Sequence, residues 1–111
     1  MILERAAITV RDGDQAAFES AFAGARRILE ASPGCRSTQL LRGVEAPASY
    51  LLLVVWDRLE DHMATFRGSP AFTRWRELVG PFFAEPPDVQ HFAPTDAGEP
   101  GEVPGRAVPP S

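Results

Sequence analysis

The chain has 111 residues, of which 44% are hydrophobic, a content that suits one compact domain and leaves too little for two. Its formal net charge of -4 and its pI near 5.1 exclude a surface built to bind nucleic acid or an anionic membrane, which requires clustered cations. One cysteine and two histidines are too few for an intramolecular disulfide or a Cys/His zinc site, so we expect no metal bound by these residues.

The first predicted element is a strand over residues 3–10, because branched side chains gather in Ile8, Thr9 and Val10. A turn cluster follows at residues 11–14, in which Asp14 is placed to cap a helix. Apolar residues then recur at helical spacing as far as Leu29, which predicts a helix that runs to about residue 31. The sequence Ser-Pro-Gly at 32–34 ends it.

Two strands are predicted next, over residues 35–42 and 50–56, with a hairpin loop between them at 43–49. The second strand is the longest apolar run of the chain, and its seven residues fall far short of the roughly twenty that a spanning helix needs. The sequence also opens without a basic segment followed by an apolar one. We therefore expect a cytoplasmic protein that makes no contact with membranes.

Two short helices are predicted between residues 57 and 79. Asp57 and Glu60 have the spacing of a capping box, and Leu59, His62, Met63 and Phe66 would then share one helical face. Gly68 breaks this helix, and Ser69 with Pro70 starts the next one. On one side of this second helix follow Phe72, Trp75, Arg76 and Val79.

A fourth strand at residues 89–92 completes the order βαββαβ, which is the ferredoxin-like α+β fold with an antiparallel sheet. We place the domain at residues 1–93. From residue 94 to 111 proline and glycine dominate, and this segment is interpreted as a disordered tail or as an extended arm on a partner.

The strand at 50–56 carries large apolar side chains on both faces, whereas two helical elements can cover only one face of the sheet. The other face would be an apolar patch of the kind that marks an interface. Two copies that pack sheet to sheet would cover it, so the sequence predicts a twofold homodimer.

Two histidines are the candidates for proton transfer. His62 lies on the inward helical stripe, and imidazole titrates near neutral pH. His91 shares a strand face with Val89, a face that could instead form the dimer seam. A lone histidine on an apolar face is more often held by a backbone carbonyl than used in chemistry. Candidate substrate-binding residues, all of which have the alternative of an ordinary core or surface role, are Trp56, Phe66, Phe72, Trp75 and Arg76.

The order and spacing of several short motifs resemble the antibiotic biosynthesis monooxygenase (ABM) family over residues 3 to 93. The motifs are Pro33-Gly34-Cys35, Trp56, Leu59-Glu60, Phe66, Ser69-Pro70, Phe72 and Val89-Gln90-His91-Phe92. The resemblance implies a dimeric α+β barrel with a cavity between sheet and helices in each protomer. It also implies an oxygenase that converts a phenol, hydroquinone or anthrone with O₂ and without flavin, haem or metal.

Two other functions fit the same residues. A related haem-degrading branch uses a helical histidine ten residues after a pocket tryptophan; the matching positions here are Arg76 and Phe66, and strand one has no asparagine. The more usual helical histidine of the family also falls on Phe66, one turn after His62. The remaining alternative is a barrel without catalytic activity that binds a hydrophobic metabolite, because a fold does not fix a function.

Overall fold

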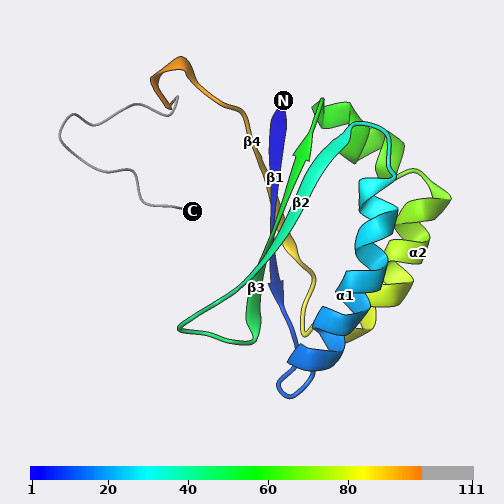
Figure 1. Ribbon diagram of the computed structural model, residues 1–111, viewed down its shortest axis with the longest axis vertical. Helices are drawn as coiled ribbons and strands as arrows, with labels where there is room; N and C mark the ends of the chain where they lie inside the picture. Colours follow the sequence, from blue (N-terminus) through cyan, green and yellow to red (C-terminus); the bar gives the residue numbers. More distant parts are fainter. Residues whose placement is uncertain (99–111) are drawn as a thin grey trace.

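The computed structural model describes residues 1–98, which form a four-stranded antiparallel sheet with helices on one face (Figure 1). This confirms the predicted βαββαβ order. The strands are β1 (Ile2–Thr9), β2 (Cys35–Arg42), β3 (Ser49–Trp56) and β4 (Asp88–Phe92). The helices are α1 (Gln15–Glu30), the π-helix η1 (Asp61–Phe66), α2 (Pro70–Val79) and the short 3-10 helices η2 (Gly80–Phe82) and η3 (Asp96–Gly98).

The strand order in the sheet is β2-β3-β1-β4, so that β1 lies between β3 and β4. Its residue Glu4 faces Val54 on one neighbour and His91 on the other. Side chains alternate between the two faces of a strand. One face of β1 therefore carries Glu4, Ala6 and Ile8, and all three are buried.

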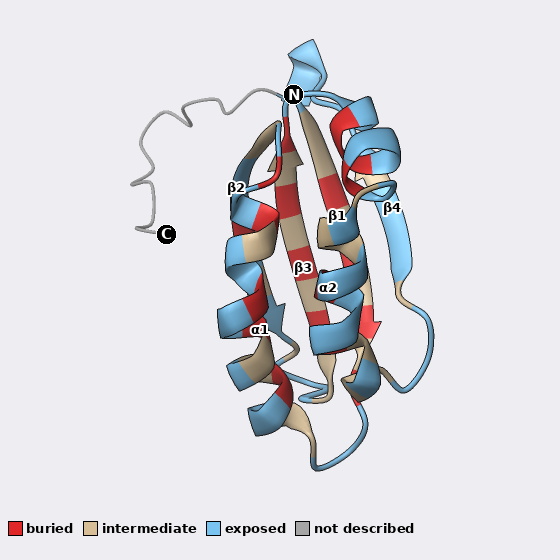
Figure 2. Ribbon diagram, turned by 90° about the vertical axis from the view of Figure 1, so that its right-hand side faces the viewer, coloured by how far each residue is buried: buried red, intermediate tan, exposed pale blue. Residues whose placement is uncertain are grey.

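The helices α1 and α2 lie side by side over this buried face, and the buried residues of β1 and β3 form stripes beneath them (Figure 2). Phe18 and Phe22 of α1 belong to the core, and the Phe22 ring meets Trp75 of α2 edge to face at 5.7 Å between centroids. Burial of these rings supplies much of the apolar stabilisation of the fold. The helical layer is thus fixed against one face of the sheet only.

The segment after β3 differs from its prediction. After an α-helical turn at Leu59 and Glu60, the structure has a π-helix over Asp61–Phe66 in place of a continued α-helix, and the Arg67 N–H donates to the His62 carbonyl five residues back at 3.1 Å. Leu59 and Met63 are consequently 40% and 43% exposed, so their predicted place on the buried face is wrong. His62 and Phe66 do point inward, as predicted.

The helix ends show which capping predictions were correct. Ser69 caps α2, where its hydroxyl oxygen accepts from the Phe72 N–H at 3.3 Å. Asp14 stands at the cap position of α1 but makes no side-chain capping bond, and the Asp57 carboxylate binds Arg36 instead of closing a capping box. Gly34 adopts a φ of 82°, the left-handed conformation expected after a helix.

The opposite face of the sheet has no helix over it in the part of the chain that the structure describes (Figure 1). Leu51, Leu53 and Val55 of β3 point to this outer face and are partly exposed. Phe92 of β4, on the same face, is 48% exposed. The predicted tail begins at residue 94; the structure describes residues 94–98, which include η3, and residues 99–111 lie outside the described part.

Candidate functional site

A cavity of about 920 Å³ lies between the inward face of the sheet and the helical layer. This size is within the range of small-molecule pockets. Its wall is mostly apolar and aromatic, and its rim is charged. The lining residues are Glu4, Ala6, Ile8, Leu29, Leu52, His62, Phe66, Arg67, Phe72, Thr73, Trp75, Arg76, Glu77, Gly80, Pro81, Phe83, Ala84, Glu85, Pro86, Pro87 and Val89.

A carboxylate stands at the inner wall of this cavity. Glu4 comes from the middle of the sheet and is only 5% exposed, which is unusual for a glutamate. The indole N–H of Trp56 donates to its Oε1 at 2.9 Å. A buried carboxylate needs such a partner, since an unpaired one is strongly disfavoured away from water. Trp56 therefore holds Glu4 in place from within the core.

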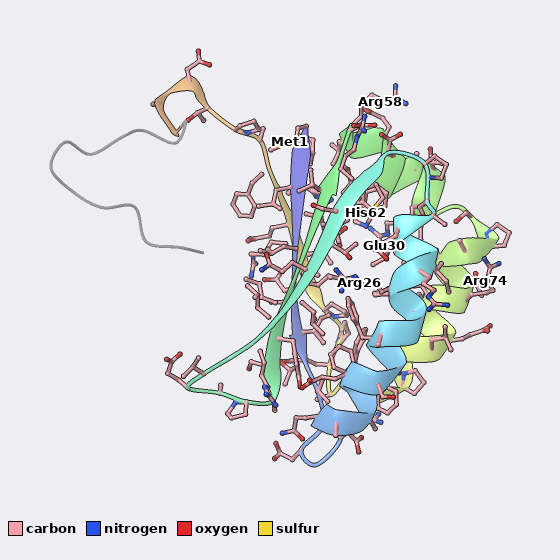
Figure 3. All side chains as sticks on the ribbon, viewed as in Figure 1. Met1, Arg26, Glu30, Arg58, His62 and Arg74 are labelled. Atoms are coloured by element: carbon pink, nitrogen blue, oxygen red, sulfur yellow. The ribbon has the colours of Figure 1, made fainter. Side chains whose placement is uncertain are left out.

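Two histidine side chains lie in sequence next to this carboxylate: His62 contacts Glu4, and His91 contacts His62. His62 Nε2 lies 3.4 Å from Glu4 Oε1, and His62 Nδ1 lies 2.8 Å from His91 Nε2. The first ring is buried between the sheet and the helical layer and stacks on Trp56 at 5.2 Å between centroids (Figure 3). The second ring, on β4, is half-buried. Between the two rings one nitrogen must donate and the other accept, so their protonation is coupled.

Burial dominates the electrostatics of these three groups. It raises the pKa of Glu4, against the opposing effects of the Trp56 hydrogen bond and the Arg67 charge. It lowers the pKa of His62 to about 4, with further lowering by His91 and Arg67. It also lowers the pKa of His91, again with help from Arg67. His62 is thus a neutral imidazole near pH 7, beside a carboxylate that binds its proton more tightly than usual.

The rim of the cavity carries two guanidinium groups that both lie close to one aromatic ring. The Cζ atoms of Arg67 and Arg76 lie 5.8 and 5.7 Å from the centroid of Phe72. Cations at this distance from an aromatic face are attracted to it. Glu77 and Glu85 also line the rim, so the opening is charged with both signs.

The structure brings five of the predicted site residues into the cavity wall: His62, Phe66, Phe72, Trp75 and Arg76. The other two are not in the wall. Trp56 is fully buried behind Glu4 and His62, and His91 lies beyond His62 at the edge strand. Direct contact of these two with a substrate therefore has no support from the cavity, whereas their contacts with the wall residues are close.

Glu4 is the site residue that sequence reasoning missed. A single glutamate in a strand usually points to solvent, and this one attracts no attention by its spacing to the histidines. One signal was available, because strict alternation places Glu4 on the face of Ala6 and Ile8. Among residues 1–98, no group of three or more His, Cys, Asp or Glu side chains is arranged to hold a metal ion.

Comparison with known proteins gives one family. The family model described as antibiotic biosynthesis monooxygenase matches residues 1–78. The uncharacterised protein YczJ of Bacillus subtilis (strain 168) is 37% identical over 92 residues, which are 83% of this chain and 97% of that protein.

Solved structures of the same family have a similar fold. A Bordetella bronchiseptica protein assigned to the antibiotic biosynthesis monooxygenases is 44% identical, with a TM-score of 0.82 over 85% of this chain and 96% of its own. SnoaB, a cofactor-independent oxygenase from Streptomyces nogalater, has a TM-score of 0.74 over 86% of this chain and 93% of its own. At 22% identity, this second likeness concerns the fold alone. No helix within residues 1–98 has the length and apolar character required to cross a membrane.

Proposed function

We propose that this chain, which belongs to the antibiotic biosynthesis monooxygenase family, oxidises a small phenol, hydroquinone or anthrone with O₂ and without a resident cofactor. The observation that carries the proposal is the combination of an aromatic cavity of about 920 Å³ with a buried Glu4 and His62 in its wall. An apolar wall suits a planar aromatic substrate, and a titratable pair inside it suits removal of a proton.

The proposed chemistry needs only a base and a dry pocket. For an anthrone, loss of one C–H proton leaves an electron-rich carbanion, which reduces O₂ and forms a C–O bond to give a peroxide. After protonation, the peroxide loses water as the second C–H bond and the O–O bond break. One oxygen atom remains as the carbonyl, and the other leaves in the water molecule. The apolar wall keeps bulk water away from the carbanion and the peroxide.

The residues of the wall divide into two roles in this proposal. Phe66, Phe72 and Trp75 contact the aromatic rings of the substrate, while Arg76 attracts its phenolate or other acidic substituent at the rim. His62 takes part in proton transfer at the inner wall.

We further propose that the protein is a homodimer in which two sheets pack through their outer faces. Leu51, Leu53 and Val55 form an apolar row along β3 on this face, between Arg5 of β1 and Gln39 of β2, and Phe92 adds an apolar side chain at the edge. A second copy offers the same patch, as a twofold interface requires. The cavity lies on the opposite face of the sheet, so each protomer keeps its own pocket.

Oxygen uptake by the purified, metal-free protein tests the oxygenase proposal. A panel of anthrones and hydroquinones is offered, and we expect consumption of one O₂ per substrate with at least one of them. His62→Ala should reduce the rate by about 10²-fold or more, the usual contribution of a proton-transferring side chain. Tight binding of a panel compound without oxygen consumption would contradict the oxygenase proposal and favour a binding protein. A Soret band in a haem titration would favour haem degradation.

A further inference from the structure

We propose that Glu4 accepts the proton of the substrate, and that His62 and His91 relay a proton from this carboxylate to the edge of the sheet. The inference rests on the proposed oxygenase function and names the base that such a reaction requires. Glu4 and His62 lie in the cavity wall and are catalytic residues in this scheme, whereas His91 acts through His62.

The side chains of Glu4, His62 and His91 form a chain of contacts from the cavity to the edge strand. Glu4 Oε1 and His62 Nε2 are 3.4 Å apart inside the cavity wall, and His62 Nδ1 and His91 Nε2 are 2.8 Å apart beyond it. His91 is absent from the cavity wall, is half-buried, and belongs to the edge strand β4, where it pairs in register with Glu4. The chain of contacts therefore begins at the pocket and ends near solvent.

The proton transfer balances without a further reactant. A substrate C–H or O–H bond breaks, its electron pair stays on the substrate, and the proton forms an O–H bond on Glu4. That proton then moves to His62 Nε2 while the proton on His62 Nδ1 moves to His91 Nε2. Glu4 is a carboxylate again, His62 has exchanged one neutral tautomer for the other, and His91 is an imidazolium. The substrate anion carries the balancing negative charge.

Two physical facts favour such a relay over a simple acid–base pair. A protonated Glu4 stands next to the carbanion and can return its proton directly, whereas a proton on His91 lies two side chains away. His62 also never becomes a cation in this scheme, which agrees with the burial that lowers its pKa to about 4. After O₂ has reacted, the proton returns along the same path and protonates the peroxide anion.

Other charged side chains near the relay come from η1, from α2 and from the segment between η2 and β4. Arg67, at the end of η1, affects all three groups, and its positive charge lowers the pKa of Glu4 and of both histidines. The same charge attracts the substrate anion and makes the imidazolium on His91 a stronger acid, which returns its proton readily. At the rim stand Arg76 and Glu77 of α2, together with Glu85.

Side-chain ¹⁵N NMR of the full chain tests the relay without a substrate, because the two imidazoles are the only ones present. We expect the nitrogen shifts of His62 to remain those of a neutral ring from about pH 8 to about pH 5. Glu4→Gln should move the His62 Nε2 resonance, while Glu60→Gln, the same change at an exposed residue, should not. A cationic His62 at neutral pH, or imidazole resonances indifferent to Glu4→Gln, would overturn the relay.

Proton removal is then measured under argon with 1,8-dihydroxyanthrone as the probe. In the wild type the absorption of the bound anthrone anion should appear after mixing. Glu4→Gln keeps an oxygen for the Trp56 indole and should slow this appearance by about 10²-fold or more with little change in affinity. His91→Gln should slow it less and should change its pH profile; unchanged rates in both variants would contradict the proposal.

Admission of air separates this inference from the proposed function. If the wild type forms the anion but consumes no O₂, the oxygenase proposal fails and the relay stands. If Glu4→Gln consumes O₂ at the wild-type rate, the relay fails and the oxygenase proposal stands. If the probe does not bind, the NMR measurement decides on the relay alone.

Discussion

Glu4 and His62 are two titratable groups whose pKa values are displaced in opposite directions by the same burial. Each displacement favours the uncharged form, because a charge in a dry site loses its hydration. The pair is therefore a carboxyl group that binds its proton more tightly than usual beside a ring that is neutral near pH 7, rather than a fixed ion pair. This is the arrangement that proton abstraction requires, and a purely structural ion pair would show the opposite displacements.

His62 makes stability depend on pH in a predictable window. Its pKa is about 4 in the folded protein and 6.5 in the unfolded chain, so the unfolded state binds more protons between these values. The contribution of His62 to the free energy of unfolding is intact above pH 6.5 and falls by up to about 3 kcal/mol as the pH drops towards 4.

The measurement for His62 is urea unfolding of the wild type and His62→Gln at several pH values. The wild type should lose more stability than His62→Gln as the pH falls from 6.5 towards 4, so any advantage of the wild type at neutral pH should decrease. The comparison is needed because the raised pKa of Glu4 acts in the opposite sense, since the folded state then binds a proton first on acidification. A stability difference that stays constant with pH would refute the assignment.

Much of the site could be predicted at the level of single residues. Phe66, Phe72, Trp75 and His62 were identified because helical spacing is local and survives without knowledge of the fold. The contact between His62 and His91 was not predictable, because it depends on the pairing of β4 with β1. Glu4 was missed for the same reason, since only the assembled sheet and η1 bury it.

At the scale of elements, η1 decides which side chains reach the cavity. In an α-helix, residues five apart are rotated by roughly 140°. The π-helical turn, with one extra residue, brings Arg67 to the cavity wall together with His62. The sequence does not indicate that this turn has one residue more than an α-helical turn, because residues at α-helical spacing in this segment are also apolar. This is why the α-helix was predicted.

Deletion of Thr65 tests this view of η1. Thr65 is exposed, and its removal would place His62, Phe66 and Arg67 at the i, i+3 and i+4 spacing of one α-helical face. We expect the protein to fold and to bind an anthrone within about threefold of the wild-type affinity, a difference below ~1 kcal/mol. Fluorescence titration measures this, with Thr65→Ala as the control. Loss of binding in the deletion variant alone would show that the π-helix itself is required.

The turn between α1 and β2 holds η1 in place through Gly34. This glycine has a φ of 82°, and an added Cβ would overlap the buried Asp61 carboxylate at the start of η1. That carboxylate accepts from the Arg58 backbone N–H at 3.1 Å, which fixes the entry into the helix. The turn and the helix are therefore packed without room for a larger residue.

Gly34→Ala should lower the free energy of unfolding by at least about 1 to 3 kcal/mol, since it adds backbone strain to a steric overlap. Gly13→Ala is the matched control, because Gly13 also has a positive φ but open space around its Cα. Thermal unfolding should show a clearly larger loss for Gly34→Ala. Equal losses would mean that the contact with Asp61 is unimportant.

At the scale of the whole molecule, the two faces of the sheet differ in what covers them. Its inward face, covered by α1 and α2, holds the cavity, and its outer face presents an apolar patch. Strand order and helix positions were predictable because each element has its own pattern and the βαββαβ order admits few arrangements. The predicted dimer followed from counting layers, and it stays a prediction until the mass in solution is measured.

Leu53→Glu provides that measurement with little harm to the protomer. Leu53 lies on the outer face in register with Arg5, whose guanidinium binds Asp88 and Gln90. In a dimer the interface would bury one added carboxylate from each protomer close to its twofold partner, which is a costly arrangement. Light scattering should give the wild type a mass about twice 12.1 kDa and the variant a mass near 12.1 kDa.

The matched control for the dimer is Leu78→Glu on α2, where the leucine is 46% exposed, outside both the cavity wall and the outer face of the sheet. It should leave the mass unchanged, and a monomeric wild type would refute the interface. Because the cavity is built from residues of one protomer, monomeric Leu53→Glu should still bind an anthrone. Loss of binding on dissociation would instead mean that the dimer shapes the pocket.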